Sequence, residues 1–135
     1  MIFCNGQFFL EHEPVIEVFD RGFLVGDAVF TTVKVVDGKA EFLQEHIERL
    51  KKQCASLQII PPEIKISDVD ELIKKNQATT GIFKLKIIIT GGSSPSLNLS
   101  KRLFGKHIMM LTPVLEVIPK EYRLTLFPIP LVSAT

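Results

Sequence analysis

The sequence contains few cysteines and no long apolar segment, and both absences restrict its class. Cys4 and Cys54 are the only cysteines among 135 residues, and two isolated cysteines provide neither a metal-ligand spacing nor a disulfide framework. No segment approaches the ~18 consecutive apolar residues of a membrane span, and the N-terminus lacks the basic-then-apolar plan of a signal peptide. We therefore expect a cytoplasmic protein without membrane contact, with both cysteines as small core residues.

An excess of positive charge is also missing. The 16 Lys and Arg residues and the 15 Asp and Glu residues give a formal net charge of +1, and the basic residues are scattered among acidic neighbours, which disfavours nucleic-acid binding. His12, His46 and His107 are isolated, and none has a second ligand at i+4. We therefore expect no metal site and interpret each histidine as structural or solvated. The phosphate-binding loop of NTPases, the dinucleotide fingerprint and the G-x-S-x-G motif are absent as well.

What is present is typical of one globular domain. Apolar residues make up 46% of the chain and charged residues 23%, and this length can bury about two thirds of the unfolded surface. The pairs Asn5-Gly6 and Asp37-Gly38 each lie between apolar runs and predict two β-hairpins, because these residues tolerate positive φ. The second hairpin should fold the strand that begins at Val29 back onto residues near 39–43.

Two helices are predicted after the second hairpin. Apolar residues recur at helical spacing in residues 44–58, and Pro61-Pro62 ends that pattern. A second helix over residues 67–78 is expected to begin at Ser67, with acidic Asp70 three residues later. The residues expected to face the core are Ile47, Leu50, Cys54, Leu57, Val69, Leu72 and Ile73.

Three further strands are predicted, at residues 82–90, 106–114 and 122–130. In the first of them, Phe83, Leu85, Ile87 and Ile89 lie on one face, and Lys84 and Lys86 point the other way. The long Gly- and Ser-bearing loop at residues 91–105 is expected to be the least ordered internal segment. This order of elements predicts an α+β fold, with a mostly antiparallel sheet and two helices on one of its faces.

The stretch DRGFLVGDAVFTTVKV, residues 20–35, combines charge with glycine and apolar side chains. The glycines Gly22 and Gly26 predict a shaped loop, and the alternating β-branched run from residue 29 predicts a strand. Asp20, Arg21 and Asp27 are interpreted as groups that brace the loop, because buried charge is tolerated when it is paired.

The ordered set of DRGFLVGDAVFTT, then VVDGK, then HIERL resembles the class IV aminotransferase family, whose members are pyridoxal-phosphate enzymes of fold type IV. The family includes branched-chain and D-amino acid aminotransferases and aminodeoxychorismate lyases. Phe30, Thr31 and Thr32 resemble the lyases, because the aminotransferases usually carry Glu where Thr31 stands. The resemblance implies pyridoxal 5'-phosphate as the cofactor, a small-molecule substrate and a homodimer.

The resemblance also implies roles for individual residues. Arg49, the arginine of H-I-x-R-L, would contact the cofactor phosphate, which suits a guanidinium with five donors and a permanent charge. The alternative is a solvated helix arginine paired with Glu45. Phe30 and Thr32 would contact the substrate, although Phe30 could equally be a core residue.

The resemblance further implies that residues 1–135 are the N-terminal domain of a two-domain enzyme. The lysine that forms the Schiff base is expected beyond Thr135, so no catalytic residue is assigned within the chain, and the chain alone is expected to be inactive. The expected function of the whole enzyme is elimination of pyruvate from aminodeoxychorismate to give 4-aminobenzoate, a step of folate biosynthesis. The alternatives are transamination of a branched-chain or D-amino acid, and a non-catalytic α+β interaction module.

Overall fold

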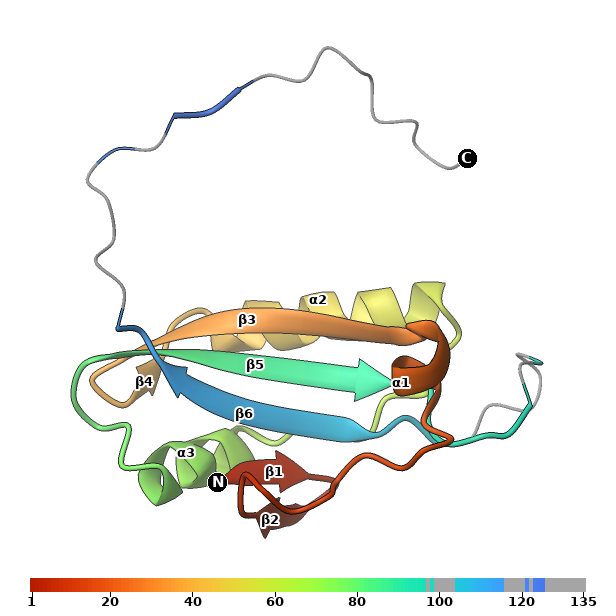
Figure 1. The fold of residues 1–135 in the computed structure, drawn as a ribbon. Helices are drawn as coiled ribbons and strands as arrows, with labels where there is room; N and C mark the ends of the chain where they lie inside the picture. Colours follow the sequence, from red (N-terminus) through yellow and green to blue (C-terminus); the bar gives the residue numbers. More distant parts are fainter. Residues whose placement is uncertain (97, 99–103, 116–120, 122, 126–135) are drawn as a thin grey trace.

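The computed structural model describes residues 1–96, 98, 104–115, 121 and 123–125. It confirms the predicted α+β architecture. The strands are β1 (Ile2–Cys4), β2 (Gln7–Phe9), β3 (Ala28–Val36), β4 (Lys39–Ala40), β5 (Ile82–Thr90) and β6 (His107–Pro113), and the helices are α1 (Arg21–Val25), α2 (Leu43–Ser56) and α3 (Ile66–Lys75). Figure 1 shows these elements along the chain.

The six strands form one antiparallel sheet in the order β2-β1-β6-β5-β3-β4. Both predicted hairpins are confirmed, and their turns have positive φ, at Asn5 (47°) and Gly6 (88°) and at Asp37 (47°) and Gly38 (79°). The two long central strands pair from Ala28 opposite Thr90 to Val36 opposite Ile82. These central strands form the rigid support on which the candidate site is built.

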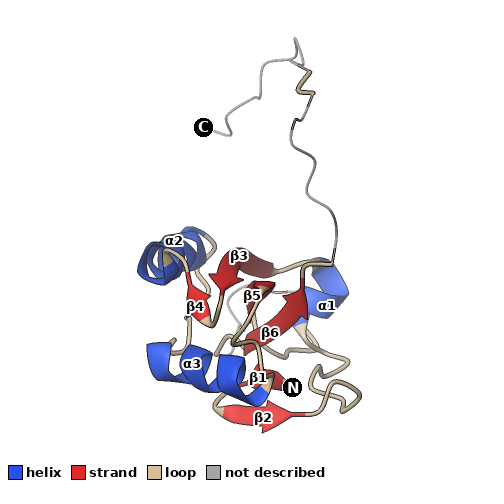
Figure 2. Cartoon of the chain, turned by 90° about the vertical axis from the view of Figure 1, so that its left-hand side faces the viewer, coloured by secondary structure: helices blue, strands red, loops and turns tan. Residues whose placement is uncertain are grey.

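Helices α2 and α3 cover one face of the sheet, and α1 lies on the other side (Figure 2). Alternate residues of β3 and β5 point into the core between the sheet and the two helices, because side chains of a strand alternate between its faces. The core residues include Val29, Val33, Val35, Leu85, Ile87, Ile89, Ile47, Leu50, Cys54, Val69, Leu72 and Ile73. The opposite face of the sheet, which carries Phe30, Thr32, Lys34, Lys84 and Lys86, is called the open face below.

Several local predictions are wrong in detail. Ser67 is not the N-cap of α3, which begins at Ile66 after Lys65 and has no side-chain cap. Asp68 in its first turn instead places negative charge near the positive end of the helix dipole. Leu57, expected in the core, follows the last residue of α2 and is 44% exposed.

The predicted loop at residues 20–27 contains a single helical turn, α1, and the first residues of the loop that follows β5 are hydrogen-bonded to the chain around α1. Within it, the amide of Gly91 donates to the carbonyl of Asp27, and the amide of Ser94 donates to the carbonyl of Phe19. Residues 97 and 99–103 of the loop predicted at 91–105 lie outside the described residues. Of the strand predicted at 122–130, only 123–125 are described, and they are not in a strand.

Candidate functional site

The charged stretch before β3 is held together by Asp20, which is fully buried. One carboxylate oxygen of Asp20 caps α1 by accepting hydrogen bonds from the amides of Gly22 (2.8 Å) and Phe23 (3.3 Å). The other oxygen accepts a hydrogen bond from the hydroxyl of Thr90 at the end of β5 (2.8 Å). Asp20 therefore fastens α1 to the central strands.

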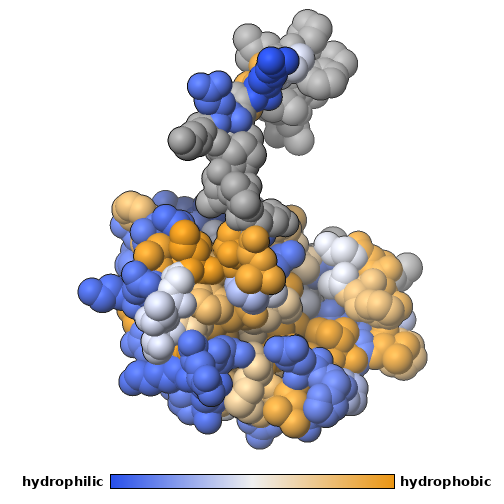
Figure 3. Space-filling view, turned by 60° about the vertical axis from the view of Figure 1, so that its left-hand side comes forward, coloured by the Kyte–Doolittle hydropathy of each residue, from blue (hydrophilic) through white to orange (hydrophobic). Residues whose placement is uncertain are grey.

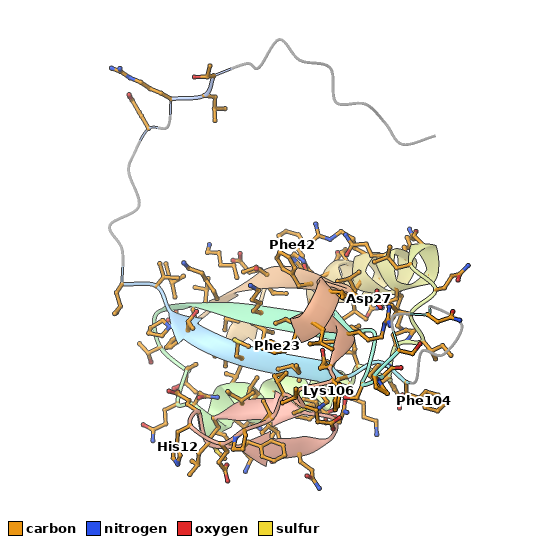
Figure 4. All side chains as sticks on the ribbon, turned by 45° about the vertical axis from the view of Figure 1, so that its right-hand side comes forward. His12, Phe23, Asp27, Phe42, Phe104 and Lys106 are labelled. Carbon is orange, nitrogen blue, oxygen red and sulfur yellow. The ribbon has the colours of Figure 1, made fainter. Side chains whose placement is uncertain are left out.

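Arg21 and Asp27 form a buried ion pair on the far side of the same turn. The Nε of Arg21 donates to Oδ2 of Asp27 at 2.7 Å, and the two side chains are 3% and 9% exposed. Arg21 also donates from Nη1 to the carbonyl of Ser96 (2.7 Å). Gly91 lies so close that a Cβ there would collide with the Asp27 carboxylate. The interpretation of the three charges as braces is confirmed, and Figure 4 shows Asp27 beside α1.

The segment before α1 is tied to the loop after β5 by Glu17. Its carboxylate accepts a hydrogen bond from the hydroxyl of Ser93, and it pairs with Lys106 (3.3 Å). The Ser93 hydrogen bond, followed by Lys106, lowers the pKa of Glu17. Lys106 also donates to the carbonyl of Val15 (3.1 Å), so this part of the loop is fixed from both sides.

Arg49 lies on the exposed flank of α2, because Ile47 and Leu50 take the core-facing positions beside it. Its Nη2 donates to the hydroxyl of Thr31 on β3 at 2.5 Å. No carboxylate among the described residues pairs with Arg49, and the alternative ion pair with Glu45 is not formed. Arg49 is thus attached to the sheet by a neutral group and keeps its full positive charge available.

His46 joins the same cluster, which sequence reasoning had missed. Its Nδ1 lies 2.6 Å from the Thr31 hydroxyl oxygen and 3.4 Å from Nη2 of Arg49. The signal was present in the H-I-x-R-L motif, because residues three apart on a helix are neighbours on its surface. Together with Phe42 and Glu45, His46 and Arg49 line a pocket of about 170 Å³.

Phe30 and Thr32 lie on the opposite face of β3, since they alternate with Thr31. Both are exposed, and the ammonium of Lys86 lies 4.6 Å from the centre of the Phe30 ring. Phe30 is 57% exposed, so the possibility of a core phenylalanine is wrong. Phe30 also lines a pocket of about 470 Å³, together with the backbone neighbours Ala28 and Val29 and with Gln53, Ser56 and Leu57 from the end of α2.

The two groups of residues flank one edge of the sheet. Within the part of the chain that the structure describes, β3 pairs with β5 along its whole length, but on its other side with β4 at Val35 and Val36 alone. Residues 28–33 of β3 therefore form an edge without a partner strand. The structure brings Arg49 to Thr31 and His46 on the helix side of this edge, and Phe30 and Thr32 to the open face.

The donors at this edge fit a phosphate group better than a metal ion. Among the described residues no group of three or more His, Cys, Asp or Glu side chains could hold a metal. Among the described residues, no hydrogen-bond partner engages Nε or Nη1 of Arg49, and these donors can bind the oxygens of a dianion in a bidentate manner. No helix among the described residues is long and apolar enough to cross a membrane.

A family model described as amino-transferase class IV matches residues 28–127. Among curated proteins, the aminodeoxychorismate lyase of Bacillus subtilis is 34% identical over 97 residues, which cover 70% of this chain and 33% of the relative. A Methanocaldococcus jannaschii protein provisionally named a branched-chain-amino-acid aminotransferase is 35% identical over 108 residues (78% of this chain, 36% of the relative). The D-alanine aminotransferase of Staphylococcus haemolyticus is 31% identical over 83 residues (59% and 29%).

Solved structures show the same fold. The 4-amino-4-deoxychorismate lyase from Pseudomonas aeruginosa aligns with a TM-score of 0.63 and 25% identity, over 84% of this chain and 40% of that one. The branched-chain aminotransferase of Escherichia coli aligns with a TM-score of 0.70 and 19% identity, over 84% and 39%. The chain spans about a third of the length of the curated relatives it matches.

Proposed function

Because this chain belongs to the amino-transferase class IV family, we propose that it is the N-terminal domain of a pyridoxal 5'-phosphate enzyme. The proposed reaction is elimination of pyruvate from 4-amino-4-deoxychorismate to form 4-aminobenzoate. The observation that carries the proposal is the exposed guanidinium of Arg49, anchored to the Thr31 hydroxyl and free of any carboxylate partner among the described residues. The substrate is a small molecule, and the setting is a cytoplasmic homodimer.

Arg49 contacts the phosphate of the cofactor in this proposal. The cofactor, when bound, supplies an electron sink for carbanion chemistry. The chain contributes the charge of Arg49 at the phosphate and the side chains of Phe30 and Thr32 on the substrate side. The lysine that binds the cofactor belongs to the remaining two thirds of the relatives' length.

Exposed apolar side chains support the two-domain proposal. Phe23 of α1 is 70% exposed, Val18 and Phe19 before it are 69% and 55% exposed, and Phe30 is 57% exposed. Figure 4 shows Phe23 in front of the sheet, and Figure 3 shows broad apolar patches between charged side chains on another side of the molecule. Surfaces of this kind are usually covered by a partner domain or subunit.

Elimination is favoured over transamination by two observations. Thr31 stands at the position where the resemblance leads us to expect Glu in aminotransferases, and the structure gives this threonine a defined task as the anchor of Arg49. The similarity to the Bacillus subtilis lyase points the same way. Transamination of a D-amino acid or a branched-chain amino acid is the second candidate, supported by relatives of comparable identity.

A direct assay separates these two activities. A protein that carries this chain together with the C-terminal part is supplied with cofactor and with aminodeoxychorismate, and 4-aminobenzoate and pyruvate are measured. In parallel it is supplied with amino acids and 2-oxo acids, and amino transfer is measured. Release of pyruvate without amino transfer is the expected result. Amino transfer without elimination would refute the lyase proposal.

The role of Arg49 is tested in the same protein by Arg49→Ala. The matched control is Lys52→Ala, which also removes one exposed positive charge from α2. We expect Arg49→Ala to weaken cofactor affinity at least tenfold, since a charge-assisted hydrogen bond contributes about 1.5–3 kcal/mol. Lys52→Ala should leave the affinity unchanged, and equal affinities for all three proteins would exclude Arg49 from the phosphate site.

The proposal also predicts the behaviour of residues 1–135 alone. They should bind pyridoxal phosphate weakly at best, because one arginine cannot supply the roughly 8 kcal/mol that a 1 μM site requires. Treatment with cofactor and borohydride, followed by mass spectrometry, should yield no specific lysine adduct. A single specifically modified lysine within residues 1–135 would refute the proposal that the lysine that binds the cofactor lies outside these residues. A monomer that binds no hydrophobic dye would instead favour a self-contained interaction module.

A further inference from the structure

The side chains of Thr31, His46 and Arg49 come together between strand β3 and helix α2. Thr31 projects from β3 and is 1% exposed, whereas His46 and Arg49 project from successive turns of α2. The Thr31 hydroxyl oxygen lies 2.5 Å from Nη2 of Arg49 and 2.6 Å from Nδ1 of His46. An exposed arginine is thereby fixed at one nitrogen by a buried hydroxyl.

The chemistry of the three groups determines the direction of one hydrogen bond and favours one direction for the other. A guanidinium can only donate, so Arg49 donates to the oxygen of Thr31. The single hydroxyl proton of Thr31 can then be donated to Nδ1 of His46; the second lone pair of the hydroxyl oxygen could instead accept a proton from that nitrogen, so the tautomer of His46 sets this direction. The 3.4 Å approach of Arg49 Nη2 to the same Nδ1 fits an acceptor there and not a second donor. The arrangement therefore favours the tautomer of His46 that carries its proton on Nε2.

We propose that Thr31 and His46 are positioning residues, which fix the Arg49 side chain in one orientation with Nε and Nη1 available to a phosphate. The inference rests on the proposed function of Arg49. It adds the two residues that fix the orientation of the Arg49 side chain before a phosphate binds. An arginine side chain has many rotamers in solution, and ordering it on binding reduces affinity. A guanidinium that is already held by Thr31 avoids most of that loss.

The first test needs no ligand, and its one substitution serves only to assign a signal. Nitrogen-15 NMR of the full 135-residue chain distinguishes the two neutral tautomers and the charged form of each imidazole, and His46→Ala assigns the signal. We expect His46 to carry its proton on Nε2. The guanidinium protons of Arg49 should give separate signals, because the hydrogen bond to Thr31 slows rotation. A proton on Nδ1 of His46 would refute the hydrogen bond from Thr31 to His46.

The second test measures binding with Thr31→Val, which preserves the shape of the side chain and removes the hydroxyl. The probe is pyridoxamine 5'-phosphate, which carries the phosphate but lacks the aldehyde that reacts with lysines, and binding is followed by NMR shift changes of the backbone amides of α2. We expect Thr31→Val to weaken binding about two- to tenfold, the range for immobilising one flexible side chain. Thr31→Ser should restore affinity, and Thr112→Val, an exposed threonine of β6, should change nothing.

The outcomes separate this inference from the proposed function. If Arg49→Ala weakens binding and Thr31→Val does not, the positioning role is refuted while the phosphate role of Arg49 stands. If Arg49→Ala has no effect on binding, the phosphate role is refuted. The tautomer of His46 and the guanidinium signals of Arg49 then still decide whether Thr31 and His46 hold the Arg49 side chain. A folded Thr31→Ser variant that binds as weakly as Thr31→Val would also refute the hydroxyl as the anchor.

Discussion

The buried imidazole of His107 should make the stability of this fold depend on pH. His107 begins β6, is 1% exposed and stacks edge-on against Phe3 with ring centres 5.2 Å apart. Its Nε2 has no hydrogen-bond partner among the described residues. Burial lowers the pKa of His107 from the ordinary 6.5 to about 4. The folded chain therefore keeps this ring neutral under conditions in which the unfolded chain protonates it.

The sign and size of the effect follow from proton linkage. Between pH 6.5 and about 4 the unfolded state binds one more proton at His107 than the folded state does, so stability falls as the pH falls through this range. A shift of one pKa unit corresponds to about 1.4 kcal/mol. From pH 7 to pH 4.5, His107 alone should lower the free energy of unfolding by about 2 kcal/mol.

Urea denaturation at pH 7 and pH 4.5 measures this effect. Carboxylates also titrate in this range, so the measurement is repeated with His107→Phe, which keeps a ring against Phe3 and cannot titrate. The difference in acid sensitivity between the two proteins isolates His107 and should be about 2 kcal/mol. Equal acid sensitivity would refute the argument, because it would mean that the ring becomes protonated equally readily in the folded and unfolded chains.

Three further outcomes are expected. Asp27→Ala leaves the buried Arg21 charge without its partner, so the free energy of unfolding should fall by about 3–5 kcal/mol in urea denaturation; a loss below 1 kcal/mol would argue against a buried pair. Gly91→Ala places a Cβ against the Asp27 carboxylate and should lower the free energy of unfolding by on the order of 1–3 kcal/mol. An unchanged urea midpoint would show that the Arg21–Asp27 pair can move aside without loss of stability. Burial raises the pKa of the Cys4 and Cys54 thiols, so a thiol reagent at pH 7 should label them after unfolding and not before; rapid labelling of the native protein would contradict their burial.

Sequence reasoning succeeded where structure depends on short-range pattern. The Asn5-Gly6 pair and its counterpart at residues 37–38 specify their turns by backbone conformation alone, and the alternation in β3 and β5 assigns each side chain to a face. The spacing of apolar residues also gave the buried side of α2 and α3, although helix ends shifted by one to three residues.

Long-range contacts account for what the sequence did not reveal. Helix α1 has a glycine at its second position and only five residues, and its cap Asp20 is itself held by Thr90, seventy residues away. The first residues of the loop after β5 likewise have distant partners, because Gly91 and Ser94 donate to the carbonyls of Asp27 and Phe19. His46 was missed because its partner Thr31 is brought within reach only when α2 packs on β3.

The open edge of β3 has a consequence for the behaviour of the chain in concentrated solution. Residues 28–33 combine β-branched and aromatic side chains with an edge that has no partner strand among the described residues, and such an edge is a template onto which another extended chain can add. Lys34 is the single charge in β3, is 54% exposed, and lies next to this edge with Glu41 3.5 Å away. Natural sheets use lysine at edges to discourage strand addition. The strand that carries Phe30 and Thr31 is thus also the edge at which self-association would begin, and Lys34 is the one charge in that strand that opposes it.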